Sequence, residues 1–393
     1  MIEVHTAQDL VLKHSSISSQ TLEVNLKDAL DFVLSEDVFS RIDMPPFRQS
    51  AMDGYALHVG GTINYNVIGE IKAGDSENPV LNKGEAVRIF TGAPVPNSAN
   101  AIIMQEKVKV QGNQIITQMP LVTQMNIRPK AEQVEKGAIA LVKGTKIKGA
   151  HIGFLSSLGI TKVMVYNKPS ISIVVTGNEL VTPGTPLAYG EIYESNGAML
   201  SAVLKELGYT KISIVTVADD YQSTKNALEE AISNHNLVIV TGGISVGDYD
   251  FVSKTLIDLD VKEIFYKVKQ KPGKPLFFGK KEAVSIFGLP GNPAAALSCF
   301  YMYVYPLLKK SEGSNNTQLP SISIPLLTDY VMKGNRAQFL KAKIQNDGVQ
   351  ILQGQSSAMV RAFGDANALV FLPEGIVEIK KGDKVKTIIL PIK

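Results

Sequence analysis

Glycine turns and carboxylates follow four short apolar segments in the middle of the chain, and they carry the clearest chemical signal. The segments end in Gly177-Asn178-Glu179, in Asp219-Asp220, in GGISVGDYD (242–250) and in GLPGNP (288–293). Glycines let backbone N–H groups approach phosphate oxygens closely, and a following helix adds its positive N-terminus. Carboxylates beside a phosphate supply the oxygen ligands that Mg²⁺ prefers. The pattern predicts a phosphate site that also holds a divalent cation.

The residues of this predicted site fall into two turns. The phosphate cradle and its flanking carboxylates are Gly242, Gly243, Ser245, Gly247, Asp248 and Asp250, and the turn after the fourth segment is Pro290, Gly291, Asn292 and Pro293. A structural interpretation stays open for both turns. The first could be a strand-to-helix turn with surface aspartates, and the second a helix start with Asn292 as N-cap and Pro293 at N1.

A lysine-rich segment, YKVKQKPGKP (266–275), precedes the last of the four apolar segments. If it is extended, Lys267, Lys269 and Lys271 alternate onto one face. Such a face is either a solvated edge strand protected by lysines or a clamp for a phosphate or oxyanion beside the carboxylates. The prolines and the glycine of KPGKP stiffen the loop and favour the clamp.

Two proline-stiffened loops nearer the N-terminus present a second group of polar side chains. MPPFRQSAMDGYAL (44–57) carries Ser50 and Asp53, and RIFTGAPVPNSANAIIMQE (88–106) carries Thr91. Asp-Gly and Thr-Gly also form ordinary turns. The residue types therefore leave both a structural and a functional role open.

Strands and helices must alternate to position the four turns. We predict strands at Ile171–Thr176, Lys211–Val217, Leu237–Thr241 and Ala283–Phe287, and helices at Gly197–Leu207, Tyr221–Asn234, Phe251–Leu259 and Ala294–Leu308. Asp220 is the expected N-cap of the second helix. This alternation indicates a doubly wound, mostly parallel sheet. Ligands of such sheets bind beyond the carboxyl ends of the strands, where all four turns fall.

The remaining sequence indicates a multi-domain α/β protein. Residues 1–40 and 136–168 are predicted to pack together as an elongated linker or dimer domain, because neither piece is large enough to close a core alone. We expect residues 41–135 to form a β-rich domain and residues 169–312 the doubly wound domain. Short strands and turns in residues 313–393 predict a small C-terminal β-barrel.

Composition excludes several classes of function. The 393 residues carry 40 Lys and Arg against 37 Asp and Glu, a net charge of +3, which argues against general nucleic-acid binding. Cys299 is the only cysteine, so a disulfide framework and a multi-cysteine metal site are excluded. No apolar run approaches the roughly 18 residues of a membrane span, and Glu3, His5 and Asp9 stand where a secretory signal is apolar. We therefore expect a cytoplasmic protein with neither a membrane nor a nucleic-acid partner.

Seven blocks of sequence, in order, resemble the molybdopterin molybdenumtransferase family, which includes the C-terminal domain of gephyrin. They are PPFRQSAMDGYAL, RIFTGAPVP with AIIMQE, NIRPKAEQV, TGNELVTPG with GEIYESN, GGISVGDYD, KPGKP and GLPGNP, and GNRAQFLKAKI and ANALVFLP continue them. The blocks fall across nearly the whole chain. The resemblance implies insertion of molybdate into adenylyl-molybdopterin, with Mg²⁺-dependent release of AMP, by an elongated homodimer of four-domain subunits.

The resemblance also implies roles for individual residues. Asp53 and Thr91 would reach the site from the other subunit of the homodimer, and the molybdopterin adenylyltransferase would be a contact partner. The substrate brings both sulfur ligands of molybdenum, so the protein needs only hard-metal and oxyanion sites, in agreement with a single cysteine. The implied carboxylate and Mg²⁺ set is Glu179, Asp219 and Asp250, the phosphate ligands are Lys267 and Lys271, and the molybdate pocket is Lys274, Pro275, Arg336 and Ser356.

Four positions depart from the family's pattern. Ala131 stands where glycine is usual, Gln133 where a carboxylate is usual, Glu194 in place of aspartate and Ala295 in place of serine. Two alternative functions are a molybdopterin adenylyltransferase, which uses a single doubly wound domain, and a catalytically silent scaffold or sensor. The additional domains and the MDGYA and TGAP blocks argue against the first, and the retained acidic residues argue against the second.

Overall fold

The computed structural model describes residues 1–243 and 251–391. The chain forms two compact units, one of Met1–Leu22 with Tyr166–Lys393 and the other of Glu23–Val165. None of the helices in the described part of the chain is long and apolar enough to cross a membrane.

The first unit is built on a six-stranded mixed sheet with the order β16-β13-β17-β21-β20-β18. The first four strands are parallel, and β20 pairs antiparallel with both β21 and β18. The strands are β13 (Ile171–Thr176), β16 (Ile212–Val217), β17 (Leu237–Thr241), β18 (Lys262–Tyr266), β20 (Phe277–Lys281) and β21 (Val284–Leu289). The four strands predicted from the sequence are confirmed. The antiparallel strands β18 and β20 are not among the strands predicted from the sequence.

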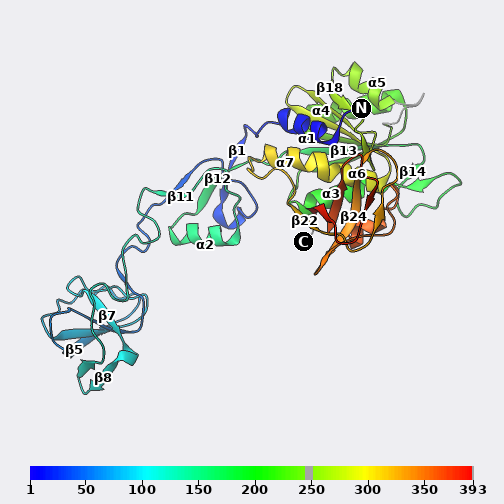
Figure 1. Ribbon diagram of the computed structural model, residues 1–393. Coiled ribbons are helices and arrows are strands. Elements are labelled where there is room, and N and C mark those ends of the chain that lie inside the picture. The colour runs from blue at the N-terminus through cyan, green and yellow to red at the C-terminus, as the bar shows by residue number, and fades with distance from the viewer. Residues whose placement is uncertain (244–250, 392–393) are drawn as a thin grey trace. The chain divides into compact units, whose positions relative to one another are not determined.

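Helices cover both faces of this sheet (Figure 1). One core contains side chains of α3 (Asn196–Glu206), α6 (Pro293–Cys299) and α7 (Tyr305–Ser311), and the other contains side chains of α4 (Tyr221–Asn234) and α5 (Phe251–Asp258). Strand β13 alternates between them: Ile173 and Val175 enter the first core and Val174 the second, as the two-residue period of a strand requires. This is the doubly wound arrangement that the sequence predicts.

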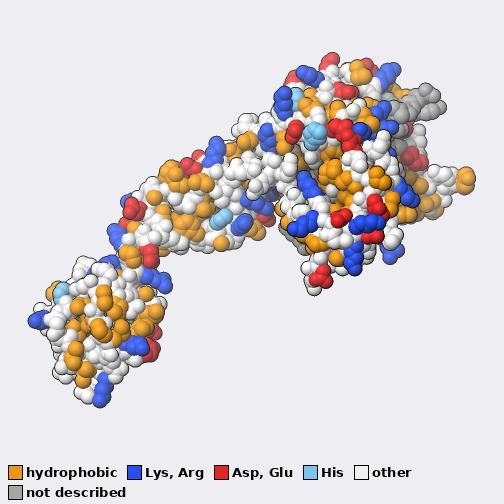
Figure 2. Space-filling view, viewed as in Figure 1, with side chains coloured by type: hydrophobic (Ala, Val, Ile, Leu, Met, Phe, Trp, Pro, Cys, Tyr) orange, Lys and Arg blue, Asp and Glu red, His pale blue; other side chains and the backbone are white. Residues whose placement is uncertain are grey.

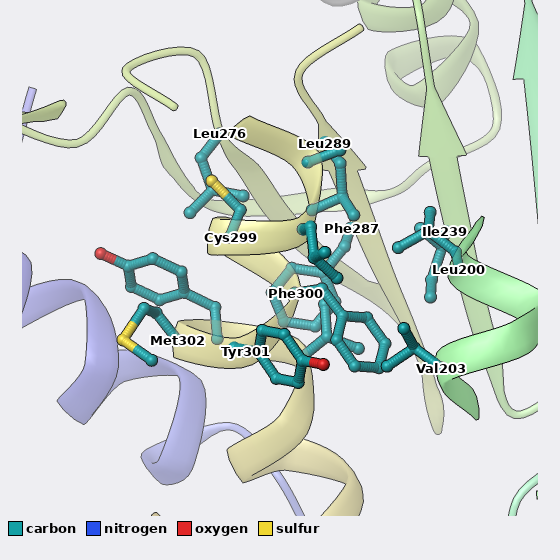
Figure 3. Close-up of a cluster of buried hydrophobic side chains, with 14 of the residues drawn as sticks. Leu200, Val203, Ile239, Leu276, Phe287, Leu289, Cys299, Phe300, Tyr301 and Met302 are labelled. Atoms are coloured by element: carbon teal, nitrogen blue, oxygen red, sulfur yellow. The ribbon is translucent and has the colours of Figure 1, made fainter. Parts of the chain in front are cut away.

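The larger core is shown in Figure 3. Leu200 and Val203 of α3 meet Phe287 of β21 and Phe300 of the helical segment that follows α6, and all four are at most 9% exposed. Burial of each such side chain is worth roughly 1.5–3 kcal/mol. This core therefore holds the strand ends at fixed positions relative to the α6 segment.

The helix expected at 294–308 is interrupted by a π-helical turn. The structure has α6, then the π turn η3 (Phe300–Val304), then α7. Pro306 has no N–H to donate to the Met302 carbonyl, and Gln8 Nε2 lies 3.4 Å from that oxygen. The π turn therefore lies next to Pro306, and the side chain of Gln8 supplies the donor that Met302 would otherwise lack.

Two further helix ends follow the sequence rules. Asp220 is the N-cap of α4, because its carboxylate accepts a hydrogen bond of 2.9 Å from Ser223 N–H, as predicted. Gly208 follows the C-cap of α3 with a φ of +82°, a conformation in which a side chain would be strained.

The C-terminal region forms a second mixed sheet, with the order β19-β24-β26-β28-β22 and β25 on β24. Its path among the described residues is open, so the expected barrel is a half-barrel. Strand β19 (Gln270–Lys271) comes from the lysine-rich segment and pairs parallel with β24. It therefore stands at one end of the strand order of this sheet. The other elements are β22 (Ser321–Pro325), β23 (Tyr330–Val331), β24 (Ala337–Gln345), β25 (Gly348–Ile351), α8 (Arg361–Asp365), β26 (Ala368–Leu372), β27 (Glu378–Ile379) and β28 (Lys384–Ile389).

The N-terminal helix α1 (Val4–Lys13) belongs to the first unit. Its apolar residues Val4, Ala7 and Val11 are buried in the larger core. The domain that joins residues 1–40 to residues 136–168 stays a prediction; within it, Leu26 and Leu34 pack against Ile147 and Leu155.

The second unit contains a six-stranded sheet, β7-β4-β6-β5-β9-β8, and a separate core. That core joins Leu26 and Leu34 to Ile147, Leu155 and Val165. Figure 2 shows that hydrophobic side chains also remain on the surface of the six-stranded part, as the exposure of Ile63, Ile68 and Val110 confirms. The elements are β1 (Thr21–Asn25), η1 (Leu26–Asp28), β2 (Val38–Phe39), β3 (Gln49–Ser50), β4 (Gly54–Leu57), β5 (Asn64–Ile71), β6 (Glu85–Ile89), β7 (Ala101–Met104), η2 (Gln105–Lys107), β8 (Val108–Gln111), β9 (Gln114–Thr117), β10 (Ile127–Arg128), β11 (Ile139–Leu141), α2 (Gly149–Ser157) and β12 (Lys162–Tyr166), and in the first unit also β14 (Leu180–Val181) and β15 (Ile192–Tyr193).

Candidate functional site

A cleft of about 490 Å³ lies at the carboxyl ends of β13, β17 and β21. We call it the acidic cleft, because Glu179 and Glu194 line it. The other predicted residues in its wall are Gly242, Gly243, Pro275, Pro290, Gly291, Asn292 and Pro293, and Thr176, Asn196 and Thr241 join them. Three of the four predicted turns therefore meet at one edge of the sheet, as the order of the strands requires.

Glycines 242 and 243 allow the backbone to pass close to the end of β13. A Cβ on Gly242 would overlap the carbonyl oxygen of Thr176, and one on Gly243 would lie 2.7 Å from Thr176 Oγ1. Their φ angles are +92° and +61°, values that favour glycine. Both glycines are therefore required by the backbone, and both line the acidic cleft.

Of the two predicted carboxylates near these turns, Glu179 lines the acidic cleft and Asp219 does not. Asp219 follows β16, and its N–H donates to Asn178 Oδ1 at 2.9 Å, which ties it to the residue before Glu179. Asp219 Oδ1 lies 3.7 Å from the position of a Cβ on Gly243. Carboxylate oxygens of this kind are suitable ligands for Mg²⁺, which commonly takes one or two carboxylates and completes its shell with phosphate oxygens and water.

Part of the predicted cradle lies outside the described residues. Ser245, Gly247, Asp248 and Asp250 all fall within 244–250. Among the residues that the structure does describe, three or more His, Cys, Asp or Glu side chains do not gather at metal-binding distance. The assignment of Glu179, Asp219 and Asp250 as one metal-binding set therefore stays a prediction.

Glu194 and Asn196 show how the cleft wall is fixed. Glu194 Oε1 accepts a hydrogen bond of 2.7 Å from Gly197 N–H in the first turn of α3, whose N-cap is Ser195. Asn196 Nδ2 donates to Thr241 Oγ1 at 2.7 Å and to the Gly291 carbonyl at 2.8 Å. Asn196 was not singled out from the sequence, although it ends the GEIYESN block. It joins the ends of β17 and β21.

Asn292 is the N-cap of α6 in backbone position only. Its side chain makes no capping hydrogen bond; Nδ2 donates to Ser357 Oγ at 3.1 Å. The N–H groups of Ala294 and Ala295 donate to the Ser357 carbonyl at 3.0 and 3.2 Å. The start of α6 is therefore satisfied by a loop of the C-terminal region, a partner that local sequence rules could not reveal.

A second cleft of about 420 Å³ adjoins the first. We call it the basic pocket, because Lys271 and Arg336 line it. It shares Pro275, Pro290 and Asn292 with the acidic cleft. The remaining lining residues are Pro272, Gly273, Ala295, Gln355, Ser356 and Ser357. Of the four residues predicted for molybdate, Pro275, Arg336 and Ser356 line the pocket, whereas Lys274 is exposed and does not line it; Lys271, predicted as a phosphate ligand, lines the same pocket.

The lysine-rich segment is not one continuous strand. Lys267 has a φ of +68°, which breaks the alternation predicted for 267, 269 and 271, and its Nζ lies 4.6 Å from the centroid of the Tyr266 ring. Lys269 pairs with Glu374 and lies 3.5 Å from Glu3. Lys271 alone of these three lysines lines the basic pocket. The predicted role of Lys267 toward phosphate stays a prediction.

The loop that carries Gln355, Ser356 and Ser357 is held by a buried lysine. Lys341 is 3% exposed, and its Nζ donates to the carbonyls of Gly354, Ser356 and Met359 at 2.6, 3.2 and 3.0 Å. Burial lowers the pKa of this ammonium group. The sequence offered one signal: Lys341 stands between apolar residues of a strand, in FLKA, at a position expected to face inward.

In the second unit, Asp53 and Thr91 form a hydrogen-bonded pair that joins the two proline-stiffened loops. Asp53 Oδ1 accepts hydrogen bonds from Thr91 N–H at 2.7 Å and from Thr91 Oγ1 at 2.8 Å. These two bonds, with Arg88 nearby, hold the pKa of the Asp53 carboxyl below its ordinary value. The neighbouring Ser50 is buried, and its hydroxyl donates to the Met52 carbonyl at 2.5 Å, which is a structural role.

These two clefts and the second unit define a multi-domain α/β protein with its site on the rim of a doubly wound sheet. Models of the MoeA N-terminal region (domain I and II), of a probable molybdopterin binding domain and of the MoeA C-terminal region (domain IV) match residues 2–159, 172–310 and 323–390. The chain is 33% identical over 396 residues to the molybdopterin molybdenumtransferase of Haemophilus influenzae, with 98% of each covered, and 30% identical over 400 residues to that of Staphylococcus epidermidis, with 99% of this chain and 95% of the relative covered.

A solved structure agrees with the sequence relatives. The molybdopterin biosynthesis moeA protein from Pyrococcus horikoshii superposes with a TM-score of 0.86 at 28% identity, covering 99% of this chain and 100% of that one. The chain therefore belongs to the molybdopterin molybdenumtransferase family. The four domain boundaries predicted from the sequence stay a prediction.

Proposed function

We propose that the protein inserts molybdate into the dithiolene of adenylyl-molybdopterin and releases AMP with Mg²⁺ present, as a molybdopterin molybdenumtransferase of molybdenum cofactor biosynthesis. The observation that carries the proposal is the adjacency of the acidic cleft and the basic pocket, which share Pro275, Pro290 and Asn292. A nucleotide phosphate and a tetrahedral oxyanion are thereby offered neighbouring sites. The relatives that carry this name match along their whole length, which disfavours a single-domain adenylyltransferase.

Each cleft suits one of the two substrates. The N–H groups around Gly242 and Gly243 and the carboxylates of Glu179 and Asp219 suit a phosphate together with Mg²⁺, which when bound would absorb negative charge on the phosphate. Lys271 and Arg336 suit the doubly charged molybdate ion. We assign Lys271 and Arg336 to hold the oxyanion while the pterin sulfurs approach it.

The burial of Cys299 supports the proposal that the substrate, and not the protein, supplies the sulfur ligands of molybdenum. Molybdenum prefers sulfur ligands, but the only thiol in the chain is buried and at 0% exposure. Burial raises the pKa of the Cys299 thiol to about 12, so it stays protonated near neutral pH. The dithiolene of the substrate, rather than the protein, must therefore bring the sulfur atoms.

A homodimer with shared sites is the second part of the proposal. The Asp53–Thr91 pair is exposed in the second unit and has the acceptor oxygens that would complete a cation or substrate site. The exposed apolar side chains Ile63, Ile68 and Val110 in the same unit are the kind of surface that a second copy buries. Contact with the molybdopterin adenylyltransferase and a cytoplasmic location belong to the same proposal.

Single-turnover reactions with adenylyl-molybdopterin and molybdate test the chemistry, with AMP release measured by chromatography. Lys271→Met should slow AMP release by at least about tenfold, because it removes a charged ligand of the oxyanion. Lys211→Met is the matched control, since Lys211 is exposed beside the amino end of β16. Accumulation of adenylyl-molybdopterin from ATP and molybdopterin, without molybdate insertion, would instead identify an adenylyltransferase.

Mixing two inactive variants tests the shared site. If Asp53 serves the cleft of the other subunit, co-expressed Asp53→Ala and Lys271→Met chains should regain about a quarter of wild-type activity, because half of the dimers are mixed and one of their two sites is intact. No recovery in mixed dimers, with each variant folded, would refute sharing.

A further inference from the structure

Gln270 is a buried residue directly beside the basic pocket, and its side chain is fully engaged. It is 1% exposed. Its Nε2 donates to the Gly273 carbonyl at 3.0 Å and lies 3.4 Å from Cys299 Sγ, and its Oε1 accepts a hydrogen bond from Tyr303 Oη. The amide is therefore fixed at both ends, with its orientation set by a carbonyl that can only accept.

Tyr303 reaches Gln270 from the π turn η3. Its side chain is at 0% exposure, and burial raises the pKa of its hydroxyl well above the ordinary value, so this hydroxyl stays protonated and can donate. π turns in helices often accompany functional sites. Here the π turn η3 carries Tyr303, whose hydroxyl reaches Gln270 of the lysine-rich segment.

The Gln270–Lys271 segment connects this network to both cations of the basic pocket. Lys271 is the next residue in the chain, and the Gln270 carbonyl accepts a hydrogen bond of 3.1 Å from Arg336 Nη1. Gln270 and Lys271 also pair with β24, where Gln270 lies opposite Ala337 and Lys271 opposite Gln338. A rotation of this peptide would therefore move Lys271 and Arg336 together.

We propose that the Gln270–Tyr303 pair is a positioning element that sets the spacing of the Lys271 and Arg336 charges for a tetrahedral oxyanion. This inference rests on the proposed function of the basic pocket. Two cations bind an oxyanion well only when their donors point to one centre. Neither Gln270 nor Tyr303 lines the pocket, so both act through the residues that they hold.

The pair leads to a specific result for Tyr303→Phe, which removes one oxygen atom and leaves the ring. The Gln270 Oε1 acceptor would then be buried without its donor, and the amide would be free to reorient. We expect molybdate binding to the full chain, measured by equilibrium dialysis, to weaken about tenfold, which corresponds to about 1.4 kcal/mol. In turnover assays the KM for molybdate should rise while the KM for adenylyl-molybdopterin stays unchanged.

Tyr301→Phe is the matched control. Tyr301 lies on the same π turn and is 5% exposed, but it lines a different small cleft with Gln8 and Lys386. Gln270→Met is the second variant, since it keeps the length of the side chain and removes both polar atoms. It should weaken molybdate binding at least as much as Tyr303→Phe. Circular dichroism establishes that each variant is folded.

The outcomes separate this inference from the proposed function. If wild-type protein binds molybdate and Lys271→Met abolishes binding, the basic pocket is established. An unchanged affinity in folded Tyr303→Phe or Gln270→Met protein then overturns the positioning role, as does an equal loss in Tyr301→Phe. If wild-type protein does not bind molybdate, or if Lys271→Met leaves binding unchanged, the proposed pocket itself is wrong.

Discussion

Gly273 offers a sharp test of the packing behind the basic pocket. Its φ is +80°, and a Cβ at this position would overlap Cys299 Sγ and lie 3.1 Å from Gln270 Nε2. Gly273→Ala therefore meets two separate penalties. One belongs to the backbone conformation and the other to a collision with a residue on α6.

The two penalties have different magnitudes and different remedies. The left-handed conformation costs a non-glycine residue about 1–2 kcal/mol. Overpacking against a buried sulfur adds roughly 1–3 kcal/mol. Gly273→Ala should thus lower the free energy of unfolding by about 2–5 kcal/mol. Removing the sulfur with Cys299→Ala should relieve only the collision.

A double-mutant cycle measures the relief. Urea unfolding of the full chain, followed by circular dichroism, gives the free energy for wild type, Gly273→Ala, Cys299→Ala and the double variant. We expect the double variant to be more stable than the sum of the single effects by about 1–3 kcal/mol. Strict additivity would show that Cys299 does not confine this turn, and the packing argument would be wrong.

Four further variants probe other parts of the chain. Asp220→Ala removes the N-cap of α4 and should cost about 1 kcal/mol in urea unfolding. Lys341→Met removes the lysine donor from the Gly354, Ser356 and Met359 carbonyls, of which Ser356 keeps the hydrogen bond from Met359 N–H. It should cost about 3 kcal/mol and speed amide hydrogen exchange in residues 354–359. Hydrogen bonds from Thr91 lower the pKa of Asp53. Their contribution to stability is therefore present near neutral pH and is lost as the pH falls through that lowered pKa. The difference in unfolding free energy between wild type and Asp53→Asn should shrink between about pH 7 and about pH 3. Gln355→Glu adds a negative charge to the basic pocket and should weaken molybdate binding about tenfold, as measured by equilibrium dialysis.

The central sheet could be predicted because its signals are local. Four β-branched runs and the cap at Asp220 determine strands and helix starts within a few residues of themselves. The carboxyl ends of parallel strands necessarily share an edge, so Glu179, Gly242 and Pro290 could be placed in one cleft without coordinates.

The features that could not be predicted depend on distant partners. Asn292 looks like an ordinary N-cap, but its side chain bonds Ser357, 65 residues away. The helix expected at 294–308 contains a π turn, and the hydroxyl of Tyr303 in this turn donates to Gln270 Oε1. Helix α1 packs in the larger core, whose other buried members begin only at Ile171. Such outcomes are decided by tertiary packing, which a single sequence does not display.

The way the cations are held explains why the basic pocket can remain positive. Lys269, outside the pocket, pairs with the carboxylates of Glu374 and Glu3. Inside or behind the pocket the cations meet neutral acceptors instead: Arg336 donates to the Gln270 carbonyl, and Lys341 donates to three backbone carbonyls. A carbonyl orients a cation without cancelling its charge, whereas a carboxylate cancels it. For the proposed oxyanion site, positioning by neutral acceptors would therefore keep the pocket positive, and we expect the geometry of these carbonyls, rather than the number of lysines, to determine the affinity.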